Sequence, residues 1–165
     1  SISLVKHLGE IFHCEMIANE WAKKAEQNLS NCKNIENKAI DYVYFIWRNP
    51  WMVAGDKTYI SEMLNLVGFR NLILTSNDLK LRYPIIEKND PILKNTQVHF
   101  FSSEPYPFKK RHIDEFKQSA NLEKGHFLLV DGQNLSWYGT RTLTALNYLI
   151  SLKQQATQLL NLIKG

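Results

Sequence analysis

Three short segments of the chain each bring aromatic rings and a cation together just after an apolar run. They span residues 42–56, 102–112 and 131–142. Loops that carry exposed aromatics are typical of binding sites, whereas a globular protein has little structural reason to place such residues there. The chemistry they favour is noncovalent, because rings pack on apolar or planar ligands and arginines pair with anionic groups. We therefore predict that the three segments together form one wall of a ligand-binding site.

The candidate ligand-binding residues share a position in or beside these loops. They are Trp47, Arg48, Trp51, Met52, Arg82, Tyr83, Tyr106, Trp137, Tyr138 and Arg141. Ligand contact is the favoured role for aromatics beside proline or glycine, notably Trp51, Tyr106 and Trp137. For Trp21 and Tyr59, which lie in apolar helical patterns, a core position is favoured. For each arginine a surface ion pair remains the alternative, and Arg141 also suits the start of the last helix.

Patterns that would indicate catalysis or metal binding are not found. The seven glycines are dispersed and form no phosphate-binding motif. His7 and His13 are six residues apart, so on one helix they would face different ways. Ser102 and Ser103 lack the glycine-flanked turn of a catalytic serine, and Glu104 has no acidic partner at a readable spacing. We expect no catalytic residue, no metal ligand, no cofactor and no enzymatic activity.

Size and composition fit one domain with a hydrophobic core. The chain has 165 residues, of which 44% are apolar. Its net charge of +4 comes from scattered basic residues, so nucleic-acid binding is not favoured. No run approaches the ~20 apolar residues of a membrane span, and residue 1 does not open a signal-peptide pattern.

The elements that must position the three loops alternate between helix and strand. Helical spacing predicts one long opening helix over residues 3–29, then a polar loop to residue 38. Strands are predicted at 42–47, 71–74, 98–101 and 126–130, with helices at 58–67, 109–118 and from Arg141 onward. This order predicts an α/β fold with a Rossmann-like, mostly parallel sheet and flanking helices. In such a sheet the ligand crevice lies beyond the carboxyl ends of the strands, where all three loops fall.

Four motifs in order carry a resemblance to a known family. They are IWRNPWMVAGDKTYISEMLNLVGFRNL, RYPII, SSEPYPFKKRHIDEF and VDGQNLSWYGTRT. Together they resemble the C-terminal lobe of ABC-importer substrate-binding proteins of the helical backbone metal receptor class. The resemblance implies one lobe of a class III periplasmic binding protein, with residues 1–29 as the linking helix, residues 40–165 as the ligand-binding lobe, and the N-terminal lobe absent. Residues 87–101 keep only a short version of the family's helix and strand.

The resemblance also implies a function. Such proteins capture cobalamin, haem or a ferric siderophore between two lobes and deliver it to an ABC permease, outside the cytoplasmic membrane. It suggests Glu104 as a permease-docking carboxylate, with Glu115 as the alternative and a solvated loop carboxylate as the plain interpretation. The expected partners are the metal chelate, the permease and the missing lobe. Two alternatives stay open: a Rossmann-like enzyme or regulatory domain, and an interaction module that pairs with a separate chain and has no transport role.

Overall fold

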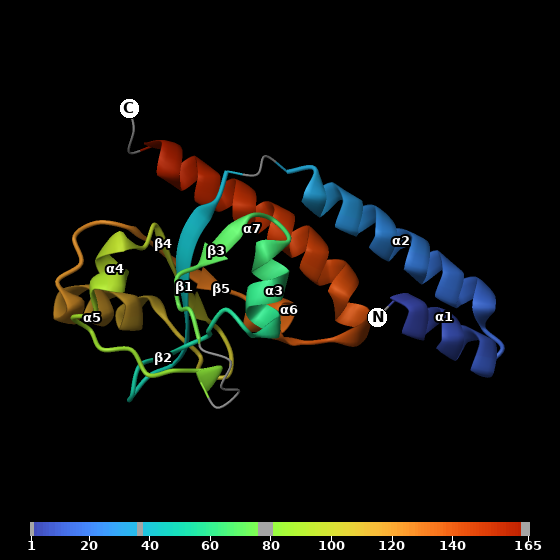
Figure 1. Cartoon of the computed structure of the whole chain (residues 1–165), viewed down its shortest axis with the longest axis horizontal. Helices are drawn as coiled ribbons and strands as arrows, with labels where there is room; N and C mark the ends of the chain where they lie inside the picture. The colour runs from blue at the N-terminus through green and yellow to red at the C-terminus, as the bar shows by residue number, and fades with distance from the viewer. Residues whose placement is uncertain (1, 36–37, 76–80, 163–165) are drawn as a thin grey trace.

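The strand β1, Ile40–Trp47, organises a five-stranded sheet in the computed structural model, which describes residues 2–35, 38–75 and 81–162. β4 (Val98–Ser102) pairs with β1 in parallel, and β5 (His126–Val130) pairs with β4 in parallel. On the other side of β1 lie β3 (Phe69–Asn71), parallel, and β2 (Met52–Val53), antiparallel. The strand order β2-β1-β4-β5, with β3 also on β1, confirms the predicted α/β fold with a mostly parallel sheet (Figure 1).

Helices cover both faces of the sheet because β1 and β4 are apolar on both sides. One face packs Tyr42, Tyr44 and Phe100 against α3 (Tyr59–Asn65) and α7 (Thr142–Leu162). The other face packs Phe45 and Phe101 against α4 (Pro91–Asn95) and α5 (Lys110–Ala120). Two short elements, α6 (Gly132–Ser136) and the 3-10 helix η2 (Gly139–Arg141), follow β5. The last helix is one continuous piece.

Several element predictions are confirmed and others are shifted. β1, β4, β5, α3 and α5 lie where the sequence pattern placed them. Thr58 caps α3, since its hydroxyl accepts a hydrogen bond from Ser61 N–H at 3.2 Å, and Gly68 follows with a positive φ of 76°. The strand expected at 71–74 instead spans 69–71, and α2 extends four residues, 30–33, into the region expected as a loop. The short β2, α4 and α6 were not predicted as elements.

The opening segment is not one helix, so that prediction is wrong. It forms α1 (Ile2–Ile11) and α2 (Glu15–Lys33), which pack side by side as a hairpin (Figure 1). The chain reverses at His13, whose φ is 53°, and Cys14 N–H donates to the Gly9 carbonyl at 2.8 Å. A Cβ on Gly9 would lie 2.4 Å from the Ala18 Cβ, so glycine permits the close approach of the two helices. Because apolar spacing continues through the turn, periodicity could not reveal the break.

A buried lysine ties α7 to the amino-terminal edge of the sheet. Lys153 is nearly fully buried, and its Nζ donates to the carbonyls of Lys38 at 2.7 Å and Gly68 at 3.0 Å. The same ammonium group lies 5.0 Å from the Phe69 ring centroid, within cation–π range. These contacts fix the starts of β1 and β3, and therefore the edge opposite the predicted ligand wall. No helix among the described residues is both long enough and apolar enough to cross a bilayer.

Candidate ligand-binding face

The loops after β1 and β4 meet at the carboxyl edge of the sheet. Trp47, the last residue of β1, is 40% exposed, and its ring packs edge-on against Tyr106 with centroids 5.7 Å apart. Tyr106 N–H donates to the Ile46 carbonyl at 3.3 Å, so backbone and side chain both join the two loops. Parallel pairing brings strand ends to one edge, and this explains why residues about sixty positions apart are in contact.

A second cluster joins the loops after β4 and β5, and we call it the Glu104 network: Glu104, Gln133, Trp137 and Arg141. Glu104 accepts hydrogen bonds from Gln133 Nε2 at 2.8 Å and from Trp137 Nε1 at 2.9 Å. Arg141 Nη1 donates to Gln133 Oε1 at 2.7 Å, and its guanidinium lies 5.8 Å from the Trp137 ring centroid. Trp137 is nevertheless 54% exposed. The network therefore holds an indole ring in place while leaving it accessible.

The local sequence around α6 makes this network possible. Asp131 caps α6, because its carboxylate accepts a hydrogen bond from Gln133 N–H at 2.9 Å. A Cβ on Gly132 would lie 2.5 Å from Ser102 Oγ and 2.8 Å from Glu104 N, so only glycine lets the two loops approach this closely. Gln133 was not among the predicted site residues. Its position directly after the Asp-Gly pair was the only sequence signal available.

We expect Glu104 to titrate at a lower pH than an ordinary glutamate. The hydrogen bonds from Gln133 and then Trp137 favour the ionised form and lower the pKa of Glu104 below its usual 4.5, with nearby Arg141 acting in the same direction. The indole N–H resonance of Trp137 should therefore change with a midpoint below pH 4.5 in an NMR titration. Gln133→Ala should move that midpoint upward, and Glu104→Gln should abolish the transition. A midpoint unchanged by both substitutions would contradict the network.

Arg48 forms an ion pair, the alternative that the sequence left open. It binds Glu115 of α5, with Nη2 at 2.6 Å from Oε1, and this contact lowers the pKa of Glu115. The Arg48 side chain is 24% exposed. Residues of the β1–β2 turn are thereby fixed to α5. Ligand contact by Arg48 stays a prediction, and both carboxylates suggested for permease docking, Glu104 and Glu115, already have partners within the lobe.

Trp51 is a core residue, so the prediction that it is an exposed loop aromatic is wrong. It is 6% exposed and packs against Phe116 at 4.8 Å between ring centroids and in parallel on Phe108 at 5.9 Å. Its loop folds back onto the sheet through β2, which the sequence pattern did not reveal. Met52 lies in β2 opposite Trp47 and is partly buried against the core.

The remaining predicted residues lie in two places, beside β2 and beside the Glu104 network. Arg82 and Tyr83 are exposed, and their segment runs along β2, since the Arg82 carbonyl accepts from Gly55 N–H at 2.9 Å. Tyr138 is exposed beside the Glu104 network, and its ring packs on Tyr59 with centroids 4.3 Å apart. The structure therefore links Trp47 with Tyr106, and Trp137 with Arg141, whereas Arg82 and Tyr83 belong to the β2 side.

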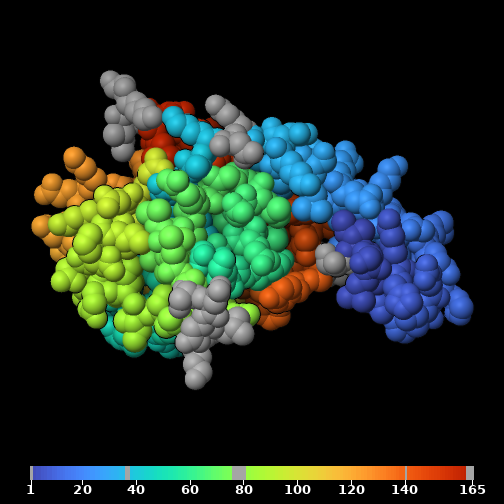
Figure 2. Space-filling view, viewed as in Figure 1, coloured from blue at the N-terminus to red at the C-terminus, as the bar shows by residue number. Residues whose placement is uncertain are grey.

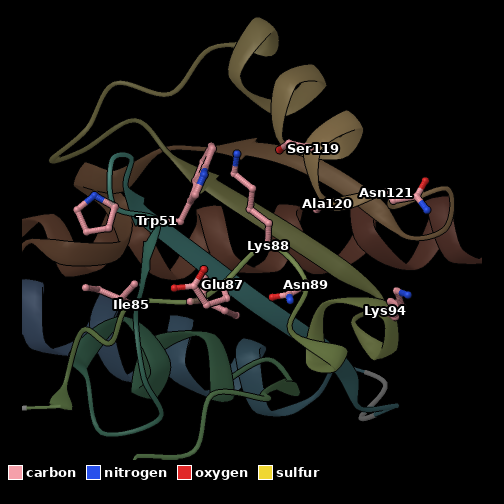
Figure 3. Close-up of a pocket in the computed structure, with 11 residues that line it drawn as sticks. Trp51, Ile85, Glu87, Lys88, Asn89, Lys94, Ser119, Ala120 and Asn121 are labelled. Atoms are coloured by element: carbon pink, nitrogen blue, oxygen red, sulfur yellow. The ribbon is translucent and has the colours of Figure 1, made fainter.

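Two open pockets include residues of the three predicted loops. One, of about 590 Å³, lies at the ends of β4 and β5 and is lined by Ser103, Phe108, Leu129, Val130, Asp131 and Gln133. The other, of about 560 Å³, lies between α5 and residues 85–89, with Trp51 and Lys88 in its middle and Ser119 and Ala120 on the α5 side (Figure 3). In the part of the chain that the structure describes, no three or more His, Cys, Asp or Glu side chains come together to hold a metal ion.

Solved structures share this fold. The chain matches the periplasmic vitamin B12 binding protein BtuF of Vibrio cholerae with a TM-score of 0.64 and 18% identity, over 87% of this chain and 55% of that one. It matches the periplasmic heme-binding protein RhuT of Roseiflexus sp. with a TM-score of 0.67 and 13% identity, over 94% of this chain and 62% of that one. The match to a possible iron-binding, periplasmic solute-binding protein of Staphylococcus epidermidis has a TM-score of 0.68 and 20% identity, over 90% of this chain and 59% of that one. No protein-family profile and no curated protein sequence matches the chain.

The fold is therefore that of one lobe of a class III periplasmic binding protein, together with the helices that adjoin it. The chain spans 55% to 62% of the length of these three proteins. A further structure with this fold is an ABC transporter substrate-binding protein from Listeria monocytogenes, with a TM-score of 0.60 and 14% identity.

Proposed function

We propose that this chain is the ligand-capturing lobe of an ABC-importer substrate-binding protein and that its ligand is a metal chelate: cobalamin, haem or a ferric siderophore. The observation that carries the proposal is the pair of exposed indoles, Trp47 and Trp137, at the carboxyl edge of a parallel sheet in this fold. Capture is noncatalytic. The proposed location is outside the cytoplasmic membrane, as for the periplasmic neighbours.

The physical basis of capture is the burial of aromatic surface on a rigid wall. Each apolar Å² that a ligand covers contributes about 25 cal/mol, so two half-exposed indoles offer a substantial gain. Trp137 is already held by Glu104, so little conformational entropy is lost when a ligand packs on it. Arg141 stands over the same ring and supplies a positive charge for an anionic substituent.

A second lobe would complete the cleft, and the α1–α2 hairpin offers a surface for it. The hairpin protrudes at one end of the molecule, as Figure 2 shows. Its exposed apolar residues are Leu4, Leu8, Ile11, Phe12, Met16 and Ile17, with Met16 83% exposed. A concentration of exposed apolar residues of this kind is typical of an interface. We propose that residues 1–29 connect the lobe of residues 40–165 to a second lobe that covers this surface.

Delivery of the ligand requires contact with a membrane permease, and the two candidate carboxylates differ in what they would report. Glu104 holds Trp137, so its removal would disturb the ligand wall as well as any docking contact. Glu115 lies on α5 and pairs with Arg48 instead. Removal of Glu115 would leave the Glu104 network intact but would release Arg48, which is itself a candidate ligand contact, so ligand affinity must be measured alongside docking for either variant.

The proposal is tested by titrating the chain with cyanocobalamin, haemin and a panel of ferric siderophores, following tryptophan quenching and calorimetric heat. We expect saturable binding of one of these ligands. Trp137→Ala should weaken that binding by about tenfold or more, because it removes the more exposed of the two indoles.

Phe12→Ala is the matched control, since it truncates an exposed ring on the hairpin, away from the sheet edge. It should leave the affinity of the lobe unchanged. Binding that is insensitive to Trp47→Ala and Trp137→Ala would place the site elsewhere. If none of the ligands binds to the lobe, with or without a second lobe present, the capture function is refuted.

A further inference from the structure

The outer edge of β5 is open. β5 is the last strand in the order β2-β1-β4-β5, and among the described residues no strand pairs with its outer side. His126 N–H donates to the Gln97 carbonyl at 3.0 Å, and Ser103 N–H donates to the Val130 carbonyl at 2.9 Å. In a parallel ladder every second residue bonds to the neighbouring strand, so the backbone groups of Phe127 and Leu129 point away from β4.

This edge lacks the usual protection against pairing. The strand HFLLV contains no proline and no charged residue, whereas natural edge strands are commonly blocked by either. Leu129 is 50% exposed, although it lies on the same side of the sheet as α5. Open pockets of about 590 and 450 Å³ meet at Leu129 along the gap between β5 and α5. The edge therefore offers both backbone hydrogen-bonding groups and apolar surface.

We infer that this edge is a self-association surface, at which β5 pairs with β5 of a second copy in antiparallel orientation around a two-fold axis at Leu128. In that register Phe127 of each copy faces Leu129 of the other, and these are the two residues whose backbone groups point outward. Each such pair exchanges two hydrogen bonds, so the sheets of the two copies join into one. The side chains of Phe127 and Leu129 of both copies then cover one another on the α5 side.

Charges on α5 favour the same arrangement. Asp114 and Lys117 both line the pocket beside β5, and Lys117 Nζ lies 4.9 Å from the Phe127 ring centroid. Asp114 lies about 4.5 Å nearer the amino end of α5, a little more than one strand residue along. The two-fold axis at Leu128 relates the level of Phe127 to that of Leu129, about 6.7 Å further on, so Asp114 of one copy comes within about 2 Å of the level of Lys117 of the other. Lys110 lines the same pocket two helical turns from Lys117 and lies farther from the axis, so the Asp114–Lys117 pairs make the surfaces self-complementary there, as an isologous dimer interface requires.

The proposed dimer covers Leu129 at the 590 Å³ pocket but does not involve the Trp47–Tyr106 pair or the Glu104 network. Antiparallel pairing of β5 points the carboxyl edges of the two joined sheets in opposite directions. Trp47 and Trp137 of the two copies would therefore open at opposite ends of the assembly.

The test is sedimentation analysis over a concentration range, in a Phe12→Lys, Met16→Lys background that removes association through the hairpin. A dimer is expected in this background. Asp114→Lys and Lys117→Asp should each raise the dissociation constant by about tenfold or more, because two symmetric attractions become repulsions. The combined charge swap, D114K with K117D, should restore the dimer. A monomer throughout, or a dimer indifferent to the single reversals, would overturn the inference.

Amide hydrogen exchange provides a second, residue-specific measurement. In the monomer the N–H groups of Phe127 and Leu129 face solvent, and in the dimer they are hydrogen-bonded. Their exchange should therefore slow as protein concentration rises. The N–H of Leu128 bonds to β4 in either state and serves as the internal control. Concentration-independent exchange at Phe127 and Leu129 would also refute pairing through β5.

Discussion

Trp51→Ala should lower the free energy of unfolding by ~4 kcal/mol, because it empties a large volume in a close-packed aromatic core. The indole contacts Phe45, Phe101, Phe108 and Phe116, with centroid separations from 4.8 to 6.4 Å. These rings come from β1, β4, α5 and the loop that precedes α5, so little can move in to fill the space. Chemical denaturation monitored by circular dichroism would measure the loss.

Trp137→Ala is the matched substitution at the surface. It removes the same side chain from a half-exposed position, so we expect a loss of stability below ~1 kcal/mol. The two variants should therefore separate the role of Trp51, which supports the fold, from the ligand contact that we propose for Trp137. If Trp51→Ala were as stable as the unsubstituted chain, the assignment of Trp51 to the core would be wrong.

Acidification should destabilise the fold through His99. The ring is fully buried in β4, stacks on Phe127 at 4.5 Å between centroids, and has Nε2 3.1 Å from the Leu93 carbonyl. Burial lowers the pKa of His99 from 6.5 to about 4, with the hydrogen bonds opposing the shift. Between these values the unfolded chain takes up a proton that the folded chain does not. The stability that neutral His99 contributes is fully present above pH 6.5. It is lost as the pH falls toward 4, a loss of ~3 kcal/mol in total.

The measurement is the slope of unfolding free energy against pH between 6.5 and 4. His99→Leu should flatten this slope, whatever it does to the absolute stability, because leucine does not titrate. His13→Asn is the control: His13 is exposed in the hairpin turn at positive φ, which asparagine tolerates. It should keep the slope of the unsubstituted chain. Equal slopes in all three proteins would show that His99 is not the group responsible.

The sequence alone determined the strands that carry the site and the edge at which they end. The apolar runs of β1, β4 and β5 are short, rich in aromatic and branched residues, and bounded by turn residues, so their positions follow from local pattern. Alternation with helices then required parallel pairing, which gathers the following loops at one edge. The grouping of Trp47 with Tyr106 follows from those two facts.

Only the tertiary structure decided which of these side chains are accessible and what they contact. The Arg48–Glu115 pair joins residues 67 positions apart, and the Glu104–Trp137 pair joins residues 33 apart. Trp51 and Trp137 both stand near turn residues, yet the return of the chain through β2 buries the first and leaves the second exposed. Likewise the packing of Gly9 on Ala18 bends an unbroken helical pattern into a hairpin. Local pattern is set by neighbours along the chain, whereas burial and pairing are set by segments that meet only when the sheet and its helices pack.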